Sequence, residues 1–223
     1  MLTDILTLDR KVTLLINGSD SALWDEFNYV ATSTIAWIPL GLLLLWLLWR
    51  DGGRRQLLTV VLLLALGILI SDQLSSNIFK PFFQRWRPAQ DPVYGYLFDT
   101  VHGYKGGKYG FFSAHASNTF SVAILLCYLI RQKWTNTFII SWSLLNCYTR
   151  VYLGVHYVGD ILVGLCFGYL IGYGLYRIYV WRICGGHRPA PRILTDASCR
   201  LLGEGILASY LLVFIIAVIR FCS

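Results

Sequence analysis

The sequence has little charge for its length. Charged residues make up 14% of the 223 residues, whereas about 25% is usual in soluble globular domains. Hydrophobic residues make up 56%, and the mean hydropathy is +0.57. This composition excludes an ordinary soluble enzyme and indicates a polytopic membrane protein whose length suits one domain.

Three further features are missing. The six cysteines include no CxxC pair or other metal-ligand spacing, so neither a disulfide framework nor a metal site is indicated. The opening MLTDILTLDR lacks the basic, apolar and small-residue order of a signal peptide, so we expect the first spanning helix to act as an uncleaved insertion signal. The net charge of +7 is scattered among the connections rather than gathered on one basic face. Membrane headgroups are therefore the expected partner, and nucleic acid is not.

Long apolar runs dominate the rest of the chain. Since about 20 apolar residues span a bilayer, six runs are long enough, at 33–50, 56–79, 114–131, 135–153, 157–181 and 203–222. The stretches 3–16 and 19–32 mix charges with apolar residues at helical spacing, which is typical of helices lying on a membrane. We predict an all-α, polytopic membrane helical bundle that forms a single domain over 1–223, with interfacial helices in 1–32 and about six transmembrane helices in 33–222.

Three polar stretches fall between these runs on the same membrane face. They are KPFFQRWRP at 80–88, FSAHAS at 112–117 and TRVYLGVHYVGD at 149–160. Ionisable groups at or in a membrane are costly to desolvate, so they indicate function by default. Three separated segments that meet on one surface predict a site.

The cations of these stretches suit phosphate. Lys80, Arg87 and Arg150 supply three positive charges, and the planar guanidinium matches phosphate oxygens. Ser113 adds a hydroxyl just before a helix, where free N–H groups and the helix dipole favour an anion. Together they predict an oxyanion cradle, although Lys80 and Arg87 taken singly are typical of membrane-edge anchors.

Two histidines lie beside this cradle. His156 is followed four residues later by Asp160, which places both on one helical face if the fifth span begins at about residue 155. An aspartate bonded to one ring nitrogen leaves the other free as a nucleophile. A structural pair or a proton relay is the alternative for these two residues, and a polar helix end is the alternative for His115. His102 and His187 have no such partners and are interpreted as bystanders.

These stretches resemble the signature of the type 2 phosphatidic acid phosphatases (PAP2), which are related to vanadium haloperoxidases. That signature is Lys, six residues, Arg-Pro; then Pro-Ser-Gly-His; then Ser-Arg, five residues, His, three residues, Asp. KPFFQRWRP matches the first part. FSAHAS matches the second with Phe112 for proline and Ala114 for glycine, and TRVYLGVHYVGD matches the third with Thr149 for serine. The resemblance covers about residues 60–175.

The resemblance implies a role for each candidate residue. The phosphate oxygens would be held by Lys80, Arg87, Ser113 and Arg150, while the catalytic residues would be His156, His115 and Asp160. His156 would attack phosphorus to give a phosphohistidine, with Asp160 orienting it and His115 protonating the leaving group. The resemblance implies neither a cofactor nor a metal, because the cations supply the electrostatic stabilisation.

The expected location follows from the remaining cations. With Lys80, Arg87 and Arg150 assigned to a site, the side that holds both termini carries six Lys and Arg residues and the other side carries ten. By the positive-inside rule, the 80–113 connection then faces away from the cytoplasm. We expect a multi-pass protein of the inner (plasma) membrane whose site faces the periplasm or the outside.

The function expected from these features is a metal-independent phosphatase acting on a phosphorylated envelope lipid. Lipid A, undecaprenyl diphosphate, phosphatidylglycerol phosphate and phosphatidic acid stay open as substrates. A lipid phosphotransferase using the same site is an alternative, and a transporter of anions is disfavoured because the charges lie at span ends. Lys105 and Lys108, among the aromatics of YKGGKYGFF, either bind a multiply anionic headgroup or anchor the loop at the membrane.

Overall fold

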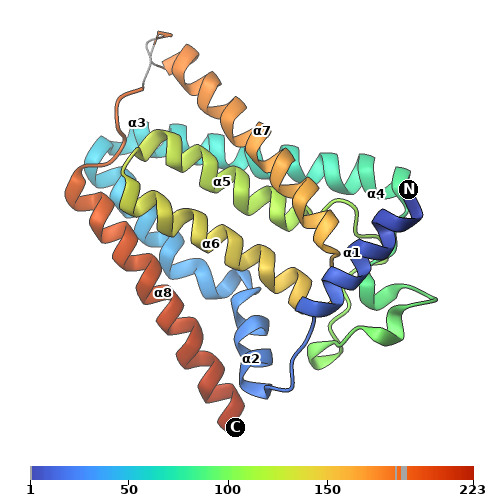
Figure 1. The fold of residues 1–223 in the computed structure, drawn as a ribbon. Helices are drawn as coiled ribbons and strands as arrows, with labels where there is room; N and C mark the ends of the chain where they lie inside the picture. Colours follow the sequence, from blue (N-terminus) through green and yellow to red (C-terminus); the bar gives the residue numbers. More distant parts are fainter. Residues whose placement is uncertain (1, 184, 187–189) are drawn as a thin grey trace.

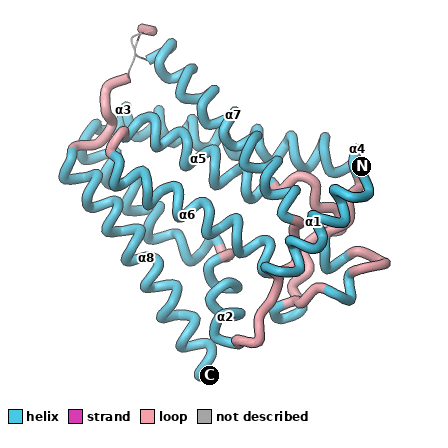
Figure 2. Tube along the Cα trace, in the orientation of Figure 1, coloured by secondary structure: helices cyan, strands magenta, loops and turns pink. Residues whose placement is uncertain are grey.

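The computed structural model describes residues 2–183, 185–186 and 190–223. Over these residues the chain consists of helices and loops with a single isolated β-bridge, so the prediction of an all-α fold is confirmed (Figures 1 and 2). The α-helices are α1 (Leu2–Ile16), α2 (Ala22–Ala31), α3 (Ile38–Asp72), α4 (Lys80–Phe83), α5 (Ala114–Ile130), α6 (Lys133–Tyr152), α7 (Val158–Ile183) and α8 (Asp196–Cys222), and a π-helical segment, η2 (Gln73–Phe79), joins α3 to α4.

Helix α3 provides two of the expected spans because it turns back on itself. Gly53 has a φ of 67° inside the helix, a conformation that glycine adopts without a steric cost. The chain therefore reverses its direction at this bend, at the left of Figure 1, and both arms of α3 extend to the same side of it. The arm after the bend continues through η2 into α4 and ends near the loops at the right.

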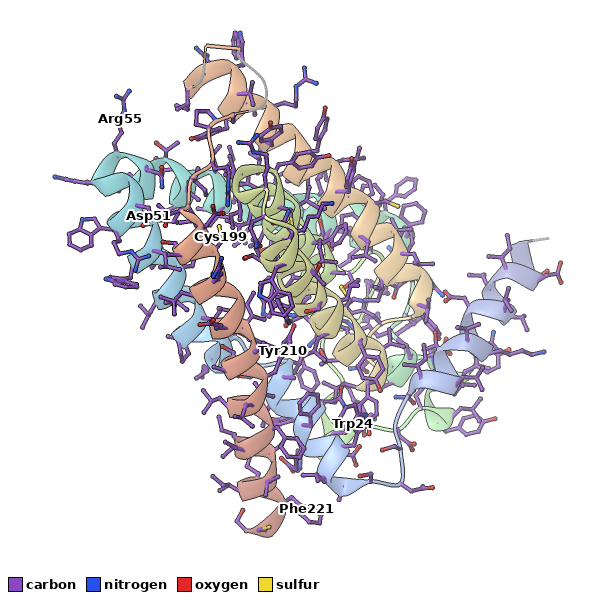
Figure 3. The ribbon with its side chains drawn as sticks, turned by 60° about the vertical axis from the view of Figure 1, so that its left-hand side comes forward. Trp24, Asp51, Arg55, Cys199, Tyr210 and Phe221 are labelled. Atoms are coloured by element: carbon purple, nitrogen blue, oxygen red, sulfur yellow. The ribbon has the colours of Figure 1, made fainter. Side chains whose placement is uncertain are left out.

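The bend of α3 is tied to the start of α8. Asp51 accepts hydrogen bonds from the backbone N–H of Thr195 at 2.8 Å and from its hydroxyl at 3.0 Å. Figure 3 places Asp51 and Cys199 toward one end of the bundle and Phe221 and Trp24 toward the other. The long helices fan out from the end that holds the bend, and the loop between α4 and α5 lies at the opposite end (Figure 1).

Glycines bring α5 and α7 into backbone contact. A Cβ added at Gly164, Gly168 or Gly172 of α7 would lie 2.7, 2.8 and 2.6 Å from the carbonyl oxygens of Ser113, Ser117 and Ser121, respectively. Small residues at four-residue spacing allow membrane helices to approach this closely. The contact fixes the start of α7 against the start of α5, where the candidate site lies.

Helix α1 docks on the turn between α6 and α7. Asn17 donates from its amide to the carbonyl of Tyr152 at 2.7 Å, and the hydroxyl of the buried Thr13 accepts from the N–H of Val158 at 3.1 Å. Asp9 lies on the same face, since residues 9, 13 and 17 follow the helical repeat. The expected helices within 3–16 and 19–32 are therefore present as α1 and α2, and their position on a membrane surface stays a prediction.

The expected spans correspond to helices. Thr34–Phe83, which contains the bend, Val158–Ile183 and Asp196–Cys222 are long and apolar enough to cross a membrane, and Ala114–Ile130 is a shorter apolar helix. Helix α6 carries more polar residues and does not meet that criterion. The chain is a membrane protein by these features, and the number of six spans stays a prediction.

Candidate active site

His156 lies in a buried turn between α6 and α7. The backbone N–H groups of Val155 and His156 both donate to the carbonyl of Arg150, at 3.1 and 3.2 Å. Gly154 has a φ of 66°, and a Cβ there would lie 2.9 Å from the carbonyl oxygen of Asp99, so the turn needs a glycine at this position. The His156 side chain is 3% exposed.

Asp160 contacts His156 in a way that differs from the expectation. Helix α7 begins at Val158, so His156 precedes the helix and the two residues do not share a helical face. Instead, Asp160 turns back over the first turn of α7. One of its carboxylate oxygens lies 3.4 Å from His156 Nδ1 and accepts from the N–H of Tyr157 at 3.1 Å. The same carboxylate therefore caps the start of α7 and also holds the imidazole of His156 in place.

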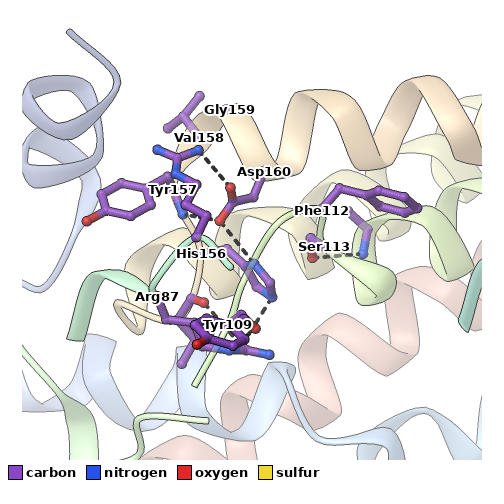
Figure 4. Close-up of polar contacts among 12 residues, drawn as sticks. Arg87, Tyr109, Phe112, Ser113, His156, Tyr157, Val158, Gly159 and Asp160 are labelled. Carbon is purple, nitrogen blue, oxygen red and sulfur yellow. Dashed lines mark hydrogen bonds and ion pairs between the residues drawn. The ribbon is translucent and has the colours of Figure 1, made fainter. Parts of the chain in front are cut away.

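The contact with Arg87 determines which ring nitrogen of His156 is unprotonated. Arg87 Nη1 lies 3.2 Å from His156 Nε2, on the side of the ring away from Asp160 (Figure 4). A guanidinium can only donate, so Nε2 carries the lone pair and the ring proton resides on Nδ1, facing Asp160. This is the tautomer in which Nε2 can attack an electrophile beside Arg87.

Burial and nearby cations keep His156 neutral. Burial lowers the pKa of His156 well below its ordinary value, and the charges of Arg87, Arg150, Lys80 and then His115 lower it further. All four of these residues therefore lie within electrostatic range of the imidazole. At neutral pH the ring is unprotonated, which a nucleophile requires.

Arg87 is held by backbone carbonyls rather than by a carboxylate. It donates to the carbonyls of Val155 at 3.1 Å and Tyr109 at 3.2 Å. Burial and then the charge of Arg150 lower the pKa of Arg87 to about 10, so the guanidinium stays charged at neutral pH. Because this positive charge has no carboxylate within hydrogen-bonding distance in the described part of the chain, it favours binding of an anion.

Arg150 has a free donor beside this charge. Its terminal nitrogens donate to the hydroxyl of Thr32 at 2.7 Å and to that of Tyr104 at 3.2 Å. Its Nε is buried and has no hydrogen-bond partner within the described part of the chain. A buried unsatisfied donor is costly, and a phosphate oxygen is a suitable acceptor for it.

The start of α5 supplies Ser113 and His115. The Ser113 hydroxyl accepts from the N–H of Ala116 at 3.3 Å, and its own N–H donates to the carbonyl of Asp160 at 3.1 Å. His115 Nε2 lies 3.3 Å from the amide oxygen of Asn146, whose nitrogen donates to a carbonyl of its own helix. Since that bond orients the amide, its oxygen accepts a hydrogen bond from His115 Nε2–H and fixes the ring.

Lys80 lies at the start of α4, with Nζ 3.5 Å from the hydroxyl of Ser76. The structure thus brings all seven candidate residues to the same end of the bundle. In contrast, His102 pairs with Glu26 at 2.6 Å and has no part in this group, whereas His187 lies outside the described residues. Among the described residues, no three His, Cys, Asp or Glu side chains come together in a way that could hold a metal ion.

Two residues that support the site were missed by the sequence reasoning. Arg85 donates to Asp160 at 2.8 Å and to Asp9 of α1 at 2.6 Å, and Asp9 also accepts from the N–H of Gly159 at 2.8 Å. Arg85 is one of the six cations on the side of the termini that the positive-inside count includes, although it lies in the first polar stretch. Asp9 carries no sequence signal, because α1 is distant in sequence and reaches the site only through the fold.

A loop glycine allows the segments of the site to approach one another. Residues 85–87 and 108–110 lie side by side, with the N–H of Arg87 donating to the carbonyl of Lys108 at 3.2 Å and that of Gly110 to Arg85 at 2.9 Å. A Cβ at Gly110 would lie 3.0 Å from a carboxylate oxygen of Asp160 and 3.5 Å from His156 Nδ1. The loop therefore packs directly on the His156–Asp160 pair.

The chain is similar in sequence to known proteins. The model of the PAP2 superfamily matches residues 56–184. A lipid A 4'-phosphatase of Porphyromonas gingivalis is 37% identical over 79% of this chain and 75% of its own length, and one of Bacteroides thetaiotaomicron is 31% identical over 96% and 92%. A putative undecaprenyl-diphosphatase of Escherichia coli is 28% identical over 79% of this chain and 92% of its own length. No solved structure matches the chain.

The family model covers more than half of the chain and includes all three polar stretches. The relatives with at least 30% identity also cover most of it. The resemblance stated from the motifs is therefore confirmed: the chain is a phosphatase that belongs to the PAP2 superfamily.

Proposed function

We propose that the protein removes a phosphate from a phosphorylated saccharolipid of the lipid A type, at the outer face of the inner membrane. The observation that carries the chemistry is the orientation of His156, whose Nε2 lone pair faces Arg87 while Nδ1 faces Asp160. The two relatives named lipid A 4'-phosphatases support this substrate class over the others. The apolar helices support a lipid in the membrane as the partner.

The phosphate binds among the cations. Arg87 places its guanidinium on the Nε2 side of His156. The charge of Arg150 acts on both residues, and its free Nε donates to a phosphate oxygen. Lys80 and the N–H groups at the start of α5, where Ser113 caps the helix, complete the cradle. These groups stabilise the charge that spreads over the phosphoryl oxygens in the transition state.

The reaction proceeds in two displacements. His156 Nε2 attacks phosphorus, the bond to the lipid oxygen breaks, and His115, protonated at both nitrogens, gives that oxygen its Nδ1 proton while Nε2–H stays bonded to Asn146. Asp160 balances the charge on the imidazole, whose Nδ1 proton it holds. Water then attacks the phosphohistidine, His115 takes its proton, and the phosphorus–nitrogen bond breaks to release phosphate and restore His156.

The roles of the two histidines can be distinguished by changing the leaving group of the substrate. His156→Ala should abolish turnover of every substrate, because each one needs the nucleophile. His115→Ala should lose about 10²- to 10⁴-fold on a lipid phosphomonoester, whose alkoxide needs a proton to leave. It should lose far less on an activated aryl phosphate, whose phenolate leaves unprotonated. His102→Ala, which changes a histidine outside the site, is the matched control.

Equal losses for His115→Ala on both substrates would contradict the general-acid role. Turnover by His156→Ala on either substrate would remove it as the nucleophile. Release of phosphate from purified lipid A, undecaprenyl diphosphate, phosphatidylglycerol phosphate and phosphatidic acid, measured in the same detergent, tests the substrate. A kcat/KM for lipid A no higher than for the other three would refute the proposed class.

A further inference from the structure

Polar side chains form a stripe on the lipid-facing side of the second arm of α3. They lie at the end of α3, in η2 and at the start of α4, and they are Asp72, Gln73, Ser76, Asn77 and Lys80. Spacings of one, four, five and eight residues place them on one face. Gln73, Ser76 and Asn77 are exposed, and Asp72 and Lys80 are partly exposed. We call this set the α3 polar stripe.

The stripe interrupts an apolar surface rather than ending it. Toward the bend, the same arm exposes Leu62 and Leu69, at 68% and 55%. In the opposite direction, Ile78 is 55% exposed and Phe82 and Phe83 are 78% and 51% exposed. A helix that left the membrane at Asp72 would not expose large apolar side chains beyond it. Because an aspartate in a spanning segment costs about 3 kcal/mol, the stripe calls for a functional explanation.

Contacts between α3 and α5 explain only the inner edge of the stripe. Asn118 of α5 donates to Asp72 at 3.0 Å, and Ser117 donates to Ser71 at 2.9 Å. Such bonds join membrane helices. However, the amide oxygen of Asn118 is buried and accepts no hydrogen bond within the described chain. The inner edge of the stripe thus holds an unpaired oxygen beside a carboxylate, and the carboxylate is partly exposed.

The outer edge of the stripe makes no contact with another helix through its amides. Asn77 donates to Gln73 at 2.5 Å, one turn away on the same surface. Within the described residues this pair bonds to no other helix, so helix packing does not account for it. Two exposed amides and a hydroxyl are thus presented to the lipid side of the helix.

The stripe leads from the phosphate cradle into the bilayer. Lys80 belongs to both, and Asp72 lies eight residues earlier, or about 12 Å along a helix. On the opposite face of η2, the buried Ser75 donates to the carbonyl of Phe112, directly before Ser113, at 2.7 Å. The stripe is therefore held at a fixed position next to the start of α5.

We propose that the α3 polar stripe binds the hydroxyl- and amide-bearing part of the lipid substrate, between its phosphate and its hydrocarbon chains. The partly exposed carboxylate of Asp72 offers acceptors, so it suits the O–H groups of a sugar or hydroxyacyl chain and the N–H of an amide-linked chain. This inference rests on the proposed function and narrows its substrate. A polyprenyl diphosphate has only hydrocarbon beyond its phosphates, and it gains nothing from the stripe.

The double variant Gln73→Leu/Asn77→Leu tests the stripe without disturbing a helix contact. Leucine is favourable at a lipid-facing position, so insertion and folding should be retained. The measured quantity is the ratio of kcat/KM for an amide-linked, hydroxyacylated phosphosaccharolipid to that for a polyprenyl diphosphate. Two lost hydrogen bonds of about 0.7 kcal/mol each lower this ratio about tenfold. Asp72→Asn, which keeps the side-chain shape, should lower it as well.

Thr59→Leu is the matched control, because it also replaces a polar side chain on this arm and bonds only within its own helix. It should leave the ratio unchanged. Binding of the dephosphorylated saccharolipid, which needs no catalysis, should weaken by a similar factor in the double variant and not in the control.

An unchanged ratio and unchanged product binding in the double variant would overturn the inference, as would equal losses on both lipids. If the wild-type protein hydrolyses neither lipid while the difference in product binding persists, the proposed function fails and the stripe stands as a binding site. The two ideas are thus refuted by different measurements.

Discussion

Replacement of Asp9 should slow catalysis, although it lies on α1 and outside the family signature. Its carboxylate accepts from Arg85 at 2.6 Å and from the N–H of Gly159 at 2.8 Å. Arg85 in turn donates to Asp160, which contacts His156. In the proposed mechanism, Asp9 is therefore a positioning residue that acts on His156 through Arg85 and Asp160.

The expected magnitude follows from these contacts. The side chains of Asp9 and Arg85 are only 12% and 20% exposed, so their bond is worth more than a surface ion pair. A hydrogen bond to a charged group contributes about 1.5–3 kcal/mol, and a helix cap contributes about 1 kcal/mol. Asp9→Ala loses both contacts, or about 3 kcal/mol. If half of this is felt in the transition state, kcat falls about tenfold.

The assay is kcat and KM on an activated aryl phosphate, with the thermal midpoint measured in parallel. Asp9→Ala should lower kcat more than it raises KM, because Asp9 does not touch the phosphate cradle. Asp9→Asn keeps an acceptor for Gly159 and should recover part of the lost kcat. Lys11→Ala, an exposed position on the same helix, is the control.

Full kcat in Asp9→Ala with a lowered thermal midpoint would show that α1 is only structural. The pair Asp9→Ala and Arg85→Ala gives a second check. If Asp9 acts through Arg85, the losses of kcat are not additive in the double variant, and additive losses would refute the linkage.

Four further outcomes are expected. Gly110→Ala should lower kcat about tenfold, because its methyl group presses on the His156–Asp160 pair; wild-type kcat would contradict this packing. Lys105→Ala/Lys108→Ala should raise KM more for a multiply charged lipid than for a singly charged one, and equal effects would make both lysines membrane anchors. Since the lowered pKa keeps His156 neutral, the NMR signals of its imidazole should show no protonation from pH about 7.5 to about 6; a titration centred at pH about 6.5 would indicate an ordinary histidine. A reporter active only outside the cytoplasm should work when fused within 95–110 and fail within 185–195, and the reverse would invert the topology.

The helices could be predicted from the sequence because each depends on a local property. Apolar runs of about 20 residues identify spanning helices without any tertiary information, and they correspond to both arms of α3 and to α5, α7 and α8. The bend at Gly53 was expected only as a short connection. The helical structure of α1 followed from its periodicity, whereas its docking face did not, because polar residues at 9, 13 and 17 have partners more than 100 residues away.

In the candidate site, too, the sequence predicted what depends on local spacing and missed what depends on tertiary packing. Motif spacing pointed to His156 and Asp160 as a pair, yet the spacing alone suggested a shared helical face. The structure places His156 in the preceding turn, because Asp160 caps the helix. Asn146 could not be predicted, since it faces His115 only through the packing of α6 on α5. Arg85 lay within a polar stretch, but nothing in its spacing distinguished it from a membrane anchor.

The glycine row of α7 has a consequence for life in a changing membrane. Bilayers thicken, thin and change lateral pressure with temperature and lipid composition, and helices that meet through long side chains can slide in response. At Gly164, Gly168 and Gly172 the backbone of α7 lies directly against carbonyl oxygens of α5, so only the side chains of α5 separate the two helices and little can slide. The distance from Ser113 to the His156 turn is thereby insulated from the surrounding lipid. The enzyme can adjust its lipid-facing helices to the membrane while its phosphate chemistry keeps one geometry.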